Sequence, residues 1–227
     1  MRRLAIALAI AMTAGVLATM VVLAAPRHPS KGHPENSKED QRMVQVFVYN
    51  KQGKLVGPVE SPKLVLTDPQ WRERLTLKQF KILRSKGTEQ PFCGTLLDNK
   101  KEGVYACAGC GLPLFSSDAK FHSGTGWPSY FQPIAKENVI EHSDNSYGTT
   151  RTEIVCARCD GHLGHVFDDG PAPTGLRFCL NSESLKFTVA DKLATLADPA
   201  AEAKSAEKPA EQPAPDSASN RPAKTKD

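Results

Sequence analysis

The 227-residue sequence lacks a large excess of charge of either sign. Its 29 lysine and arginine residues stand against 25 aspartate and glutamate residues, which gives a formal net charge of +4. Within residues 72–189 the balance is 14 basic to 13 acidic side chains. Because a protein that holds a polyanion needs a large positive field, this composition argues against nucleic-acid binding.

Two further absences divide the chain. Residues 4–25 have no charged side chain, and residues 190–227 have no aromatic side chain but contain 11 alanines and 5 prolines. We therefore expect 190–227 to be a disordered tail, because such a composition cannot bury enough apolar surface. Residues 26–42 are polar, contain three prolines and are predicted to be a linker. The remaining 147 residues, 43–189, suit one domain of the usual ~100–200 residues.

The amino terminus has the layout of an export signal. Arg2 and Arg3 precede the uncharged run, and Val22 to Ala25 close it with small residues. The run exceeds the ~7–15 residues of an ordinary signal and reaches the ~20 that span a bilayer. Residues 1–25 are thus predicted to be a signal peptide or a membrane anchor, and both alternatives stay open. Either one places the domain outside the cytoplasm, periplasmic or membrane-anchored, with this segment as its only membrane contact.

The folded part is predicted to be mainly β. The residues Val44–Tyr49, a turn at Asn50–Gly53 and Leu55–Val56 indicate a β-hairpin, which we assign to an amino-terminal extension over 43–70. The following residues alternate between short β-rich runs and turn residues, which favours antiparallel sheets. The predicted strands are Gly103–Cys107, Thr152–Cys156, Arg177–Leu180 and Leu185–Val189.

One short helix is predicted from Thr76. Thr76 and Gln79 have the spacing of a capping box, and Gly87 stands where a helix ends. The expected apolar stripe of this helix consists of Leu77, Phe80 and Leu83.

Four of the six cysteines form two Cys-x-x-Cys pairs, Cys107/Cys110 and Cys156/Cys159. A two-residue gap lets two thiolates approach one tetrahedral ion at about 2.3 Å, so the pairs predict a zinc site of two knuckles. Export leaves disulfide pairing as an alternative. A thioredoxin-like redox pair is a further alternative, although neither pair precedes a convincing helix.

A second group of residues suggests a reactive thiol. In a strand, Arg177, Cys179 and Asn181 project from one face, where a guanidinium can stabilise a thiolate. Upstream, His162 and His165 can donate protons near neutral pH, and a nearby acid, Asp169, is expected to orient one of them.

Several motifs together resemble the methionine-R-sulfoxide reductase B family. They are Gly124–Ser129 (GTGWPS), His162–Val166 (HLGHV), Arg177–Ser182 (RFCLNS) and the two cysteine pairs, and the resemblance runs from about residue 71 to 189. It implies a barrel-like fold of two antiparallel sheets and the reduction of methionine-R-sulfoxide, free or in oxidised proteins, to methionine. We expect a monomer recycled by a thioredoxin-like reductant.

The resemblance also implies residue roles. Cys179 is the expected nucleophile, Arg177 favours its thiolate, and His162, His165 and Asn181 stand where the family protonates the sulfoxide oxygen. Trp127 is expected to hold the substrate methyl group. Many family members have their resolving cysteine where this chain has Thr125. The position of Cys93 resembles that of the resolving cysteine in a family variant, where this thiol lies in an amino-terminal loop. The disulfide between Cys93 and Cys179 would then be reduced by an external dithiol.

A different class of function remains possible from the residues alone. An exported, non-catalytic zinc module that binds a partner protein would explain the four paired cysteines. It assigns no task to Arg177, Cys179 and the two histidines. Stereospecific reduction of the sulfoxide distinguishes the two hypotheses.

Overall fold

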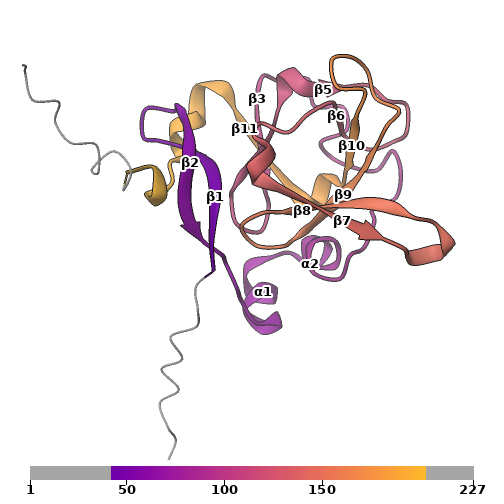
Figure 1. Cartoon of the computed structure of the whole chain (residues 1–227), viewed down its shortest axis with the longest axis horizontal. Coiled ribbons are helices and arrows are strands. Elements are labelled where there is room, and N and C mark those ends of the chain that lie inside the picture. Colours follow the sequence, from indigo (N-terminus) through magenta and orange to yellow (C-terminus); the bar gives the residue numbers. More distant parts are fainter. Residues whose placement is uncertain (1–41, 203–227) are drawn as a thin grey trace, which may run out of the picture. The chain divides into compact units, whose positions relative to one another are not determined.

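The computed structural model describes residues 42–202 (Figure 1). The predicted signal or anchor of residues 1–25, nearly all of the predicted linker and residues 203–227 lie outside this range. Within it, no helix is long and apolar enough to span a membrane.

The amino-terminal extension is the expected antiparallel hairpin of β1 (Met43–Tyr49) and β2 (Leu55–Pro62). The strands form because β-branched residues alternate, and Val46, Val48 and Val59 bury one face. The Asn50 side chain accepts hydrogen bonds from the backbone N–H groups of residues 52 and 54, which closes the turn. The second strand is longer than the two residues predicted for it.

Two short helices follow, α1 (Asp68–Arg74) and α2 (Leu77–Leu83). The predicted capping box of α2 is present, and the Gly87 N–H donates to the Lys81 carbonyl at 2.9 Å, as expected at a helix end. The predicted stripe is wrong at Leu77, whose side chain is 78% exposed. The buried face of α2 consists of Phe80, Ile82 and Leu83.

A three-stranded antiparallel sheet has the order β11-β3-β4. It contains β3 (Gly103–Cys107), β4 (Pro113–Ser116) and β11 (Leu185–Val189). Every residue of β3 is buried because this central strand has a neighbour on both sides. The tight turn between β3 and β4 contains the first cysteine pair.

A six-stranded antiparallel sheet has the order β5-β6-β10-β9-β8-β7. Its strands are β5 (Lys120–Phe121), β6 (Ser129–Tyr130), β7 (Val139–Asp144), β8 (Arg151–Cys156), β9 (His162–Phe167) and β10 (Arg177–Leu180). Short 3-10 helices connect the strands: η1 (Ser117–Ala119), η2 (Lys136–Asn138), η3 (Ser146–Gly148) and η4 (Ser182–Ser184). The predicted fold of two antiparallel sheets is confirmed.

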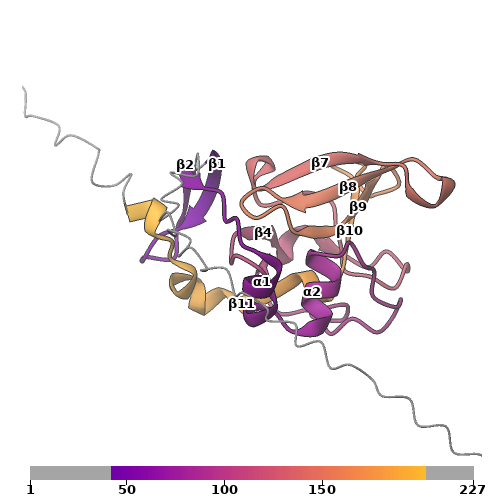
Figure 2. The ribbon, with the colours of Figure 1, turned by 90° about the horizontal axis from the view of Figure 1, so that it is seen from below.

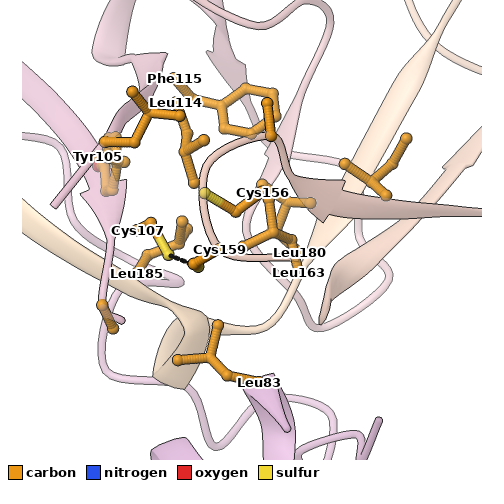
Figure 3. Close-up of a cluster of buried hydrophobic side chains, with 14 of the residues drawn as sticks. Leu83, Tyr105, Cys107, Leu114, Phe115, Cys156, Cys159, Leu163, Leu180 and Leu185 are labelled. Carbon is orange, nitrogen blue, oxygen red and sulfur yellow. Dashed lines mark hydrogen bonds between the residues drawn. The ribbon is translucent and has the colours of Figure 1, made fainter. Parts of the chain in front are cut away.

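The hydrophobic core lies between these layers. Figure 2 shows β7, β8 and β9 on one side, and β4, β11 and the two helices on the other. Aromatic rings from both sheets meet there: the centroids of Phe115 and Tyr130 are 4.7 Å apart, and those of Phe115 and Phe178 are 5.7 Å apart. Figure 3 shows three of the paired cysteines among these apolar side chains. The predicted metal site is therefore part of the core.

The structure differs from the prediction where the disordered tail was expected to begin. Residues 190–196 form the 3-10 helix η5 (Ala190–Leu196), and Ala197 pairs with Tyr49 of the hairpin. The Asp198 N–H donates to the Tyr49 carbonyl at 2.9 Å. This segment is ordered by contact with the extension, which local composition does not reveal.

Candidate active site and metal centre

Cys179 lies in β10, at the centre of the six-stranded sheet. Its Cα pairs with Ser129 of β6 on one side and with His165 of β9 on the other. A Cβ atom at Gly164 would lie 2.0 Å from the Cys179 carbonyl oxygen, so only glycine lets β9 approach β10 this closely. The thiol borders a cavity of about 120 Å³ lined by Thr88, Trp127, Arg151, Gly164, His165, Phe167, Cys179, Leu180 and Asn181.

The thiol is part buried among polar groups. Burial raises the pKa of Cys179 above its usual value, while hydrogen bonding by Thr125 and Ser129 and the charge of Arg177 lower it; burial prevails. The Thr125 Oγ1 is 3.9 Å from the sulfur, and Ser123 links Thr125 to Ser129 through contacts of 2.8 and 2.7 Å. A chain of hydroxyl groups therefore supports the nucleophile. It includes Thr125, the position at which many family members are expected to have their resolving cysteine.

Arg177 is held beside the thiol by two contacts. Its Nε and Nη2 donate to the two carboxylate oxygens of Asp169 at 2.8 and 2.9 Å, and its guanidinium lies 4.3 Å from the centroid of the Phe167 ring. These hydrogen bonds raise the pKa of Arg177 and lower that of Asp169. The prediction that Asp169 orients a histidine is wrong, because it binds Arg177 across the β9–β10 turn.

His165 and His162 instead receive acids from neighbouring strands. The His165 Nε2 is 2.8 Å from Asp144 Oδ2 of β7, and the His162 Nδ1 is 2.7 Å from Glu153 Oε1 of β8. The two rings are 5.5 Å apart. Both acids were missed by the sequence analysis. No sequence signal identifies the pairs, because even the register of β8 and β9 opposes Glu153 to His165 and not to its partner His162.

The two histidines differ in environment. His165 lines the cavity next to Cys179, whereas His162 is buried. Burial lowers the pKa of His162, although Glu153 acts in the opposite direction. Burial alone would raise the pKa of Glu153, but hydrogen bonds from Lys86 and His162 outweigh it and lower that pKa. His165 is only partly buried and lines the cavity, so it is better placed to exchange protons with a bound molecule.

Asn181 and Trp127 both bind the backbone at Glu89. The Asn181 side chain accepts from the Glu89 N–H at 3.0 Å and donates to the Leu163 carbonyl at 3.0 Å, while the Trp127 Nε1 donates to the Glu89 carbonyl at 3.2 Å. The Glu89 carboxylate in turn accepts from the N–H groups of residues 182 and 183. Glu89, which the sequence analysis missed, therefore fixes the orientation of both cavity-lining side chains.

Cys93 is exposed and lies in a loop that contacts the Gly126 turn. The N–H of Phe92 donates to the Gly126 carbonyl at 2.8 Å, beside Thr125 and Trp127. A Cβ at Gly126 would lie 2.8 Å from the Pro91 Cβ, so this glycine permits the approach. Cys93 and Cys179 are both free thiols in this structure.

The four paired cysteines come together as one cluster. Their sulfur atoms lie within 4.8 Å of one another, with 3.7 Å between Cys107 and Cys159 and 3.4 Å between Cys110 and Cys156. A tetrahedral site with metal–sulfur bonds of about 2.3 Å has edges of about 3.8 Å, whereas a disulfide bond is about 2.05 Å long. The geometry fits one tetrahedral metal ion and does not contain the alternative disulfides.

Residues from outside this cluster support its second knuckle. Arg84 Nη1 donates to the Cys159 carbonyl at 2.7 Å, and the Leu64 N–H donates to the Arg158 carbonyl at 2.8 Å. Arg158 Nη1 is 2.8 Å from Asp198 Oδ2, and their side chains are only 10% and 19% exposed. The segment after β2 and the carboxyl-terminal segment thus both contact the turn that holds Cys156 and Cys159.

Comparison with known proteins agrees with this arrangement. Residues 75–189 match the SelR domain. Three relatives are each named peptide methionine sulfoxide reductase MsrB. The protein of Agrobacterium fabrum is 55% identical over 132 residues, which cover 58% of this chain and 98% of the relative. That of Methanosarcina mazei is 56% identical over 126 residues, 56% of this chain and 90% of the relative. That of Leptospira interrogans is 56% identical over 121 residues, 53% of this chain and 92% of the relative.

Proposed function

The chain belongs to the methionine-R-sulfoxide reductase B family, whose SelR domain it contains, and from this premise we propose how its residues act as a peptide-methionine (R)-S-oxide reductase. The observation that carries the proposal is the position of Cys179. Its thiol borders a cavity together with Trp127 and His165, and Arg177 lies beside it. A nucleophile, a proton donor and an apolar ring therefore face the same small space.

The first step transfers the sulfoxide oxygen to cysteine. The Cys179 thiolate attacks the sulfoxide sulfur while His165, hydrogen-bonded to Asp144, gives a proton to the oxygen. The hydroxyl then passes from the substrate sulfur to Cys179 Sγ as the bond formed between the two sulfur atoms breaks, so that methionine leaves and Cys179 becomes a sulfenic acid. The sulfoxide gains the two electrons that Cys179 loses. Arg177 favours the attacking thiolate. The His162 ring, hydrogen-bonded to Glu153, packs edge to face against the His165 ring and holds it in place.

Trp127 positions the substrate. Its Nε1 is bound to the Glu89 carbonyl, which fixes the ring at the cavity wall. An S-methyl group packs well against a flat, polarisable surface. The ring thereby turns the sulfoxide sulfur toward Cys179.

A second thiol then removes the sulfenic acid. We assign this task to Cys93, whose loop is hydrogen-bonded to the Gly126 turn beside Thr125. Attack of Cys93 on the Cys179 sulfenic acid forms a disulfide and releases water. The two Cα atoms must lie within about 7 Å of each other when this disulfide forms. A thioredoxin-like dithiol then reduces the disulfide.

Zinc is the metal that the four thiolate ligands favour. It would be held by Cys107, Cys110, Cys156 and Cys159, and when bound it supplies a cross-link between the β3–β4 and β8–β9 turns. The ligands do not line the Cys179 cavity, so their role is structural.

We further propose that the enzyme is an exported monomer. The uncharged run of residues 4–25 after Arg2 and Arg3 supports export. Amino-terminal sequencing of the mature protein distinguishes a cleaved signal from a retained anchor.

A stereospecific assay tests the proposed activity. With dithiothreitol as reductant, the full chain should convert methionine-R-sulfoxide but not the S epimer. A Cys179→Ser variant should lose all turnover, while a Cys93→Ser variant should still complete a single turnover. Equal activity on both epimers, or turnover by the Cys179 variant, would contradict the proposal, whereas turnover of neither epimer by the intact chain would favour the non-catalytic zinc module.

A further inference from the structure

A second and larger cavity shares Trp127 with the Cys179 cavity. It has a volume of about 410 Å³, within the range of small-ligand sites. Its lining consists of Phe92, Leu97, Asp98, Asn99, Lys100, Lys101, Ser117, Lys120, Phe121, His122, Ser123, Gly124, Gly126, Trp127 and Pro128. We call it the lysine cavity. Trp127 lines both this cavity and the Cys179 cavity, so a molecule that contacts the ring can enter both.

The lysine cavity has an excess of positive charge. Lys100, Lys101 and Lys120 line it, whereas Asp98 is its one acidic side chain. Neither Lys100 nor Lys101 forms an ion pair with any of residues 42–202. Lys120 Nζ donates to the Leu97 carbonyl at 2.6 Å, which places its charge at the wall. Burial lowers the pKa of Lys120, and Lys100 adds to this effect while Asp98 opposes it. A bound anion would relieve this repulsion.

The smaller Cys179 cavity is not lined by any of these three lysines. A space of about 120 Å³ takes a methionine sulfoxide side chain but leaves its polypeptide outside. Because Trp127 lines both cavities, the backbone of a protein substrate that passes beside this ring borders both of them. Successive residues of an extended chain are about 3.3 Å apart, and residues i and i+2 point to the same side. A side chain within two residues of the sulfoxide reaches the neighbouring cavity.

We propose that the lysine cavity binds an acidic side chain located within two residues of the methionine sulfoxide in a polypeptide substrate. The inference rests on the proposed function and defines a preferred class of substrate for it. Aspartate and glutamate are the side chains that match Lys100, Lys101 and Lys120, and the cavity is wide enough for either with its adjoining backbone. Free methionine sulfoxide has no such side chain and does not use the cavity.

Three synthetic peptides test this inference. Each carries one methionine-R-sulfoxide flanked on both sides by glutamate, glutamine or lysine, and kcat/KM is measured with dithiothreitol at low ionic strength. Because each exposed ion pair has a modest effect, we expect the glutamate peptide to exceed the glutamine peptide by roughly three- to tenfold. The lysine peptide should be poorer than both, and added salt should shrink the differences.

Charge-removing variants locate the effect. The Lys100→Gln/Lys101→Gln double variant should lose most of the preference for glutamate while its kcat/KM for free methionine-R-sulfoxide stays unchanged. Lys78→Gln, which removes an exposed charge on α2 outside the cavity, is the matched control and should keep the preference.

The outcomes separate this inference from the proposed function. Absence of turnover of free methionine-R-sulfoxide contradicts the proposed function itself. Normal turnover of the free substrate with equal rates for the three peptides, or with a preference that the double variant retains, overturns the lysine cavity as a peptide site. A double variant that changes only the KM for a thioredoxin-like reductant also overturns it, since the cavity then binds the reductant.

Discussion

The Arg158–Asp198 ion pair offers a sharp test of how the carboxyl-terminal segment supports the metal-binding turn. Asp198→Ala removes the carboxylate that lies 2.8 Å from Arg158 Nη1. It also removes the Oδ1 that accepts from the Ala200 N–H at 3.0 Å. Asp198→Asn keeps an acceptor for that N–H but removes the charge, so comparing the two variants separates these contributions.

The expected loss follows from the burial of the pair. Removing one partner of a buried ion pair costs about 3–5 kcal/mol, because the other charge stays buried without compensation. The Arg158 side chain is 10% exposed, and its Nε and Nη2 already have no hydrogen-bond partner among the described residues. Since Asp198 is 19% exposed, we expect a loss just below this range, about 2–3 kcal/mol. For a domain of this size such a loss lowers Tm by about 4–12 °C.

Urea unfolding of the metal-loaded full chain measures the free-energy loss, and transfer of the metal to a chromogenic chelator reports on the turn. Asp198→Ala should unfold at lower urea and release the metal faster. Lys51→Ala is the matched control, because its pair with Glu202 has side chains 70% and 39% exposed and should contribute under about 1 kcal/mol.

Two results would refute this reasoning. A loss below about 1 kcal/mol in Asp198→Ala would mean that water solvates Arg158 without help, contrary to its burial. An unchanged rate of metal release, together with a clear loss of stability, would show that residues 190–202 support the hairpin and not the metal-binding turn.

Four further predictions concern the catalytic residues and the metal. Arg177→Met should raise the pKa of Cys179, so the alkaline rise of kcat/KM should move to higher pH; an unmoved pH profile would exclude Arg177 as thiolate support. Glu153→Gln should lower the pKa of His162 further, because the carboxylate raises it, and an NMR titration of the ring can follow this change. The same variant should lose stability less steeply on acidification. The lowered pKa of Glu153 means that its stabilisation is present above the unfolded value and is lost as the pH falls through the folded one. Cys93→Ser should keep turnover with dithiothreitol but lose at least tenfold with a thioredoxin-like reductant, measured by coupled NADPH oxidation. Chelation of the metal should lower Tm by at least 10 °C in scanning calorimetry, because three buried thiolates and one partly buried thiolate then lose their shared cation.

The sequence reveals local structure where a short pattern is sufficient. The Thr76/Gln79 capping box places the start of α2, and the alternating residues of β10 and β11 place both strands with their observed bounds. Thr67 and Gln70 form the same kind of box at α1, which the sequence analysis did not use. The metal cluster was also predictable, because Cys-x-x-Cys spacing is a property of one turn.

Contacts between strands were harder to predict. Asp169 is close to His165 in sequence, yet the β9–β10 turn places it beside Arg177. The acids that bind the histidines, Asp144 and Glu153, come from β7 and β8, so finding them requires the register of three strands. Residues 190–202 have no periodic pattern that would predict structure. Contacts with the hairpin and with the Arg158 side chain hold this segment in place.

The position of the hairpin has a practical consequence for work with the protein on surfaces or in fusions. Both ends of the described chain contact it: the Lys63 N–H donates to the Arg42 carbonyl at 2.9 Å, and the Lys51 N–H donates to Glu202 Oε1 at 3.4 Å. Figure 1 shows β1 and β2 on the left of the folded part, and β9 and β10, which carry His165 and Cys179, farther to the right. A resin or a fused reductase module attached on the hairpin side would therefore lie away from β9 and β10, and would keep clear of large oxidised proteins that approach these strands.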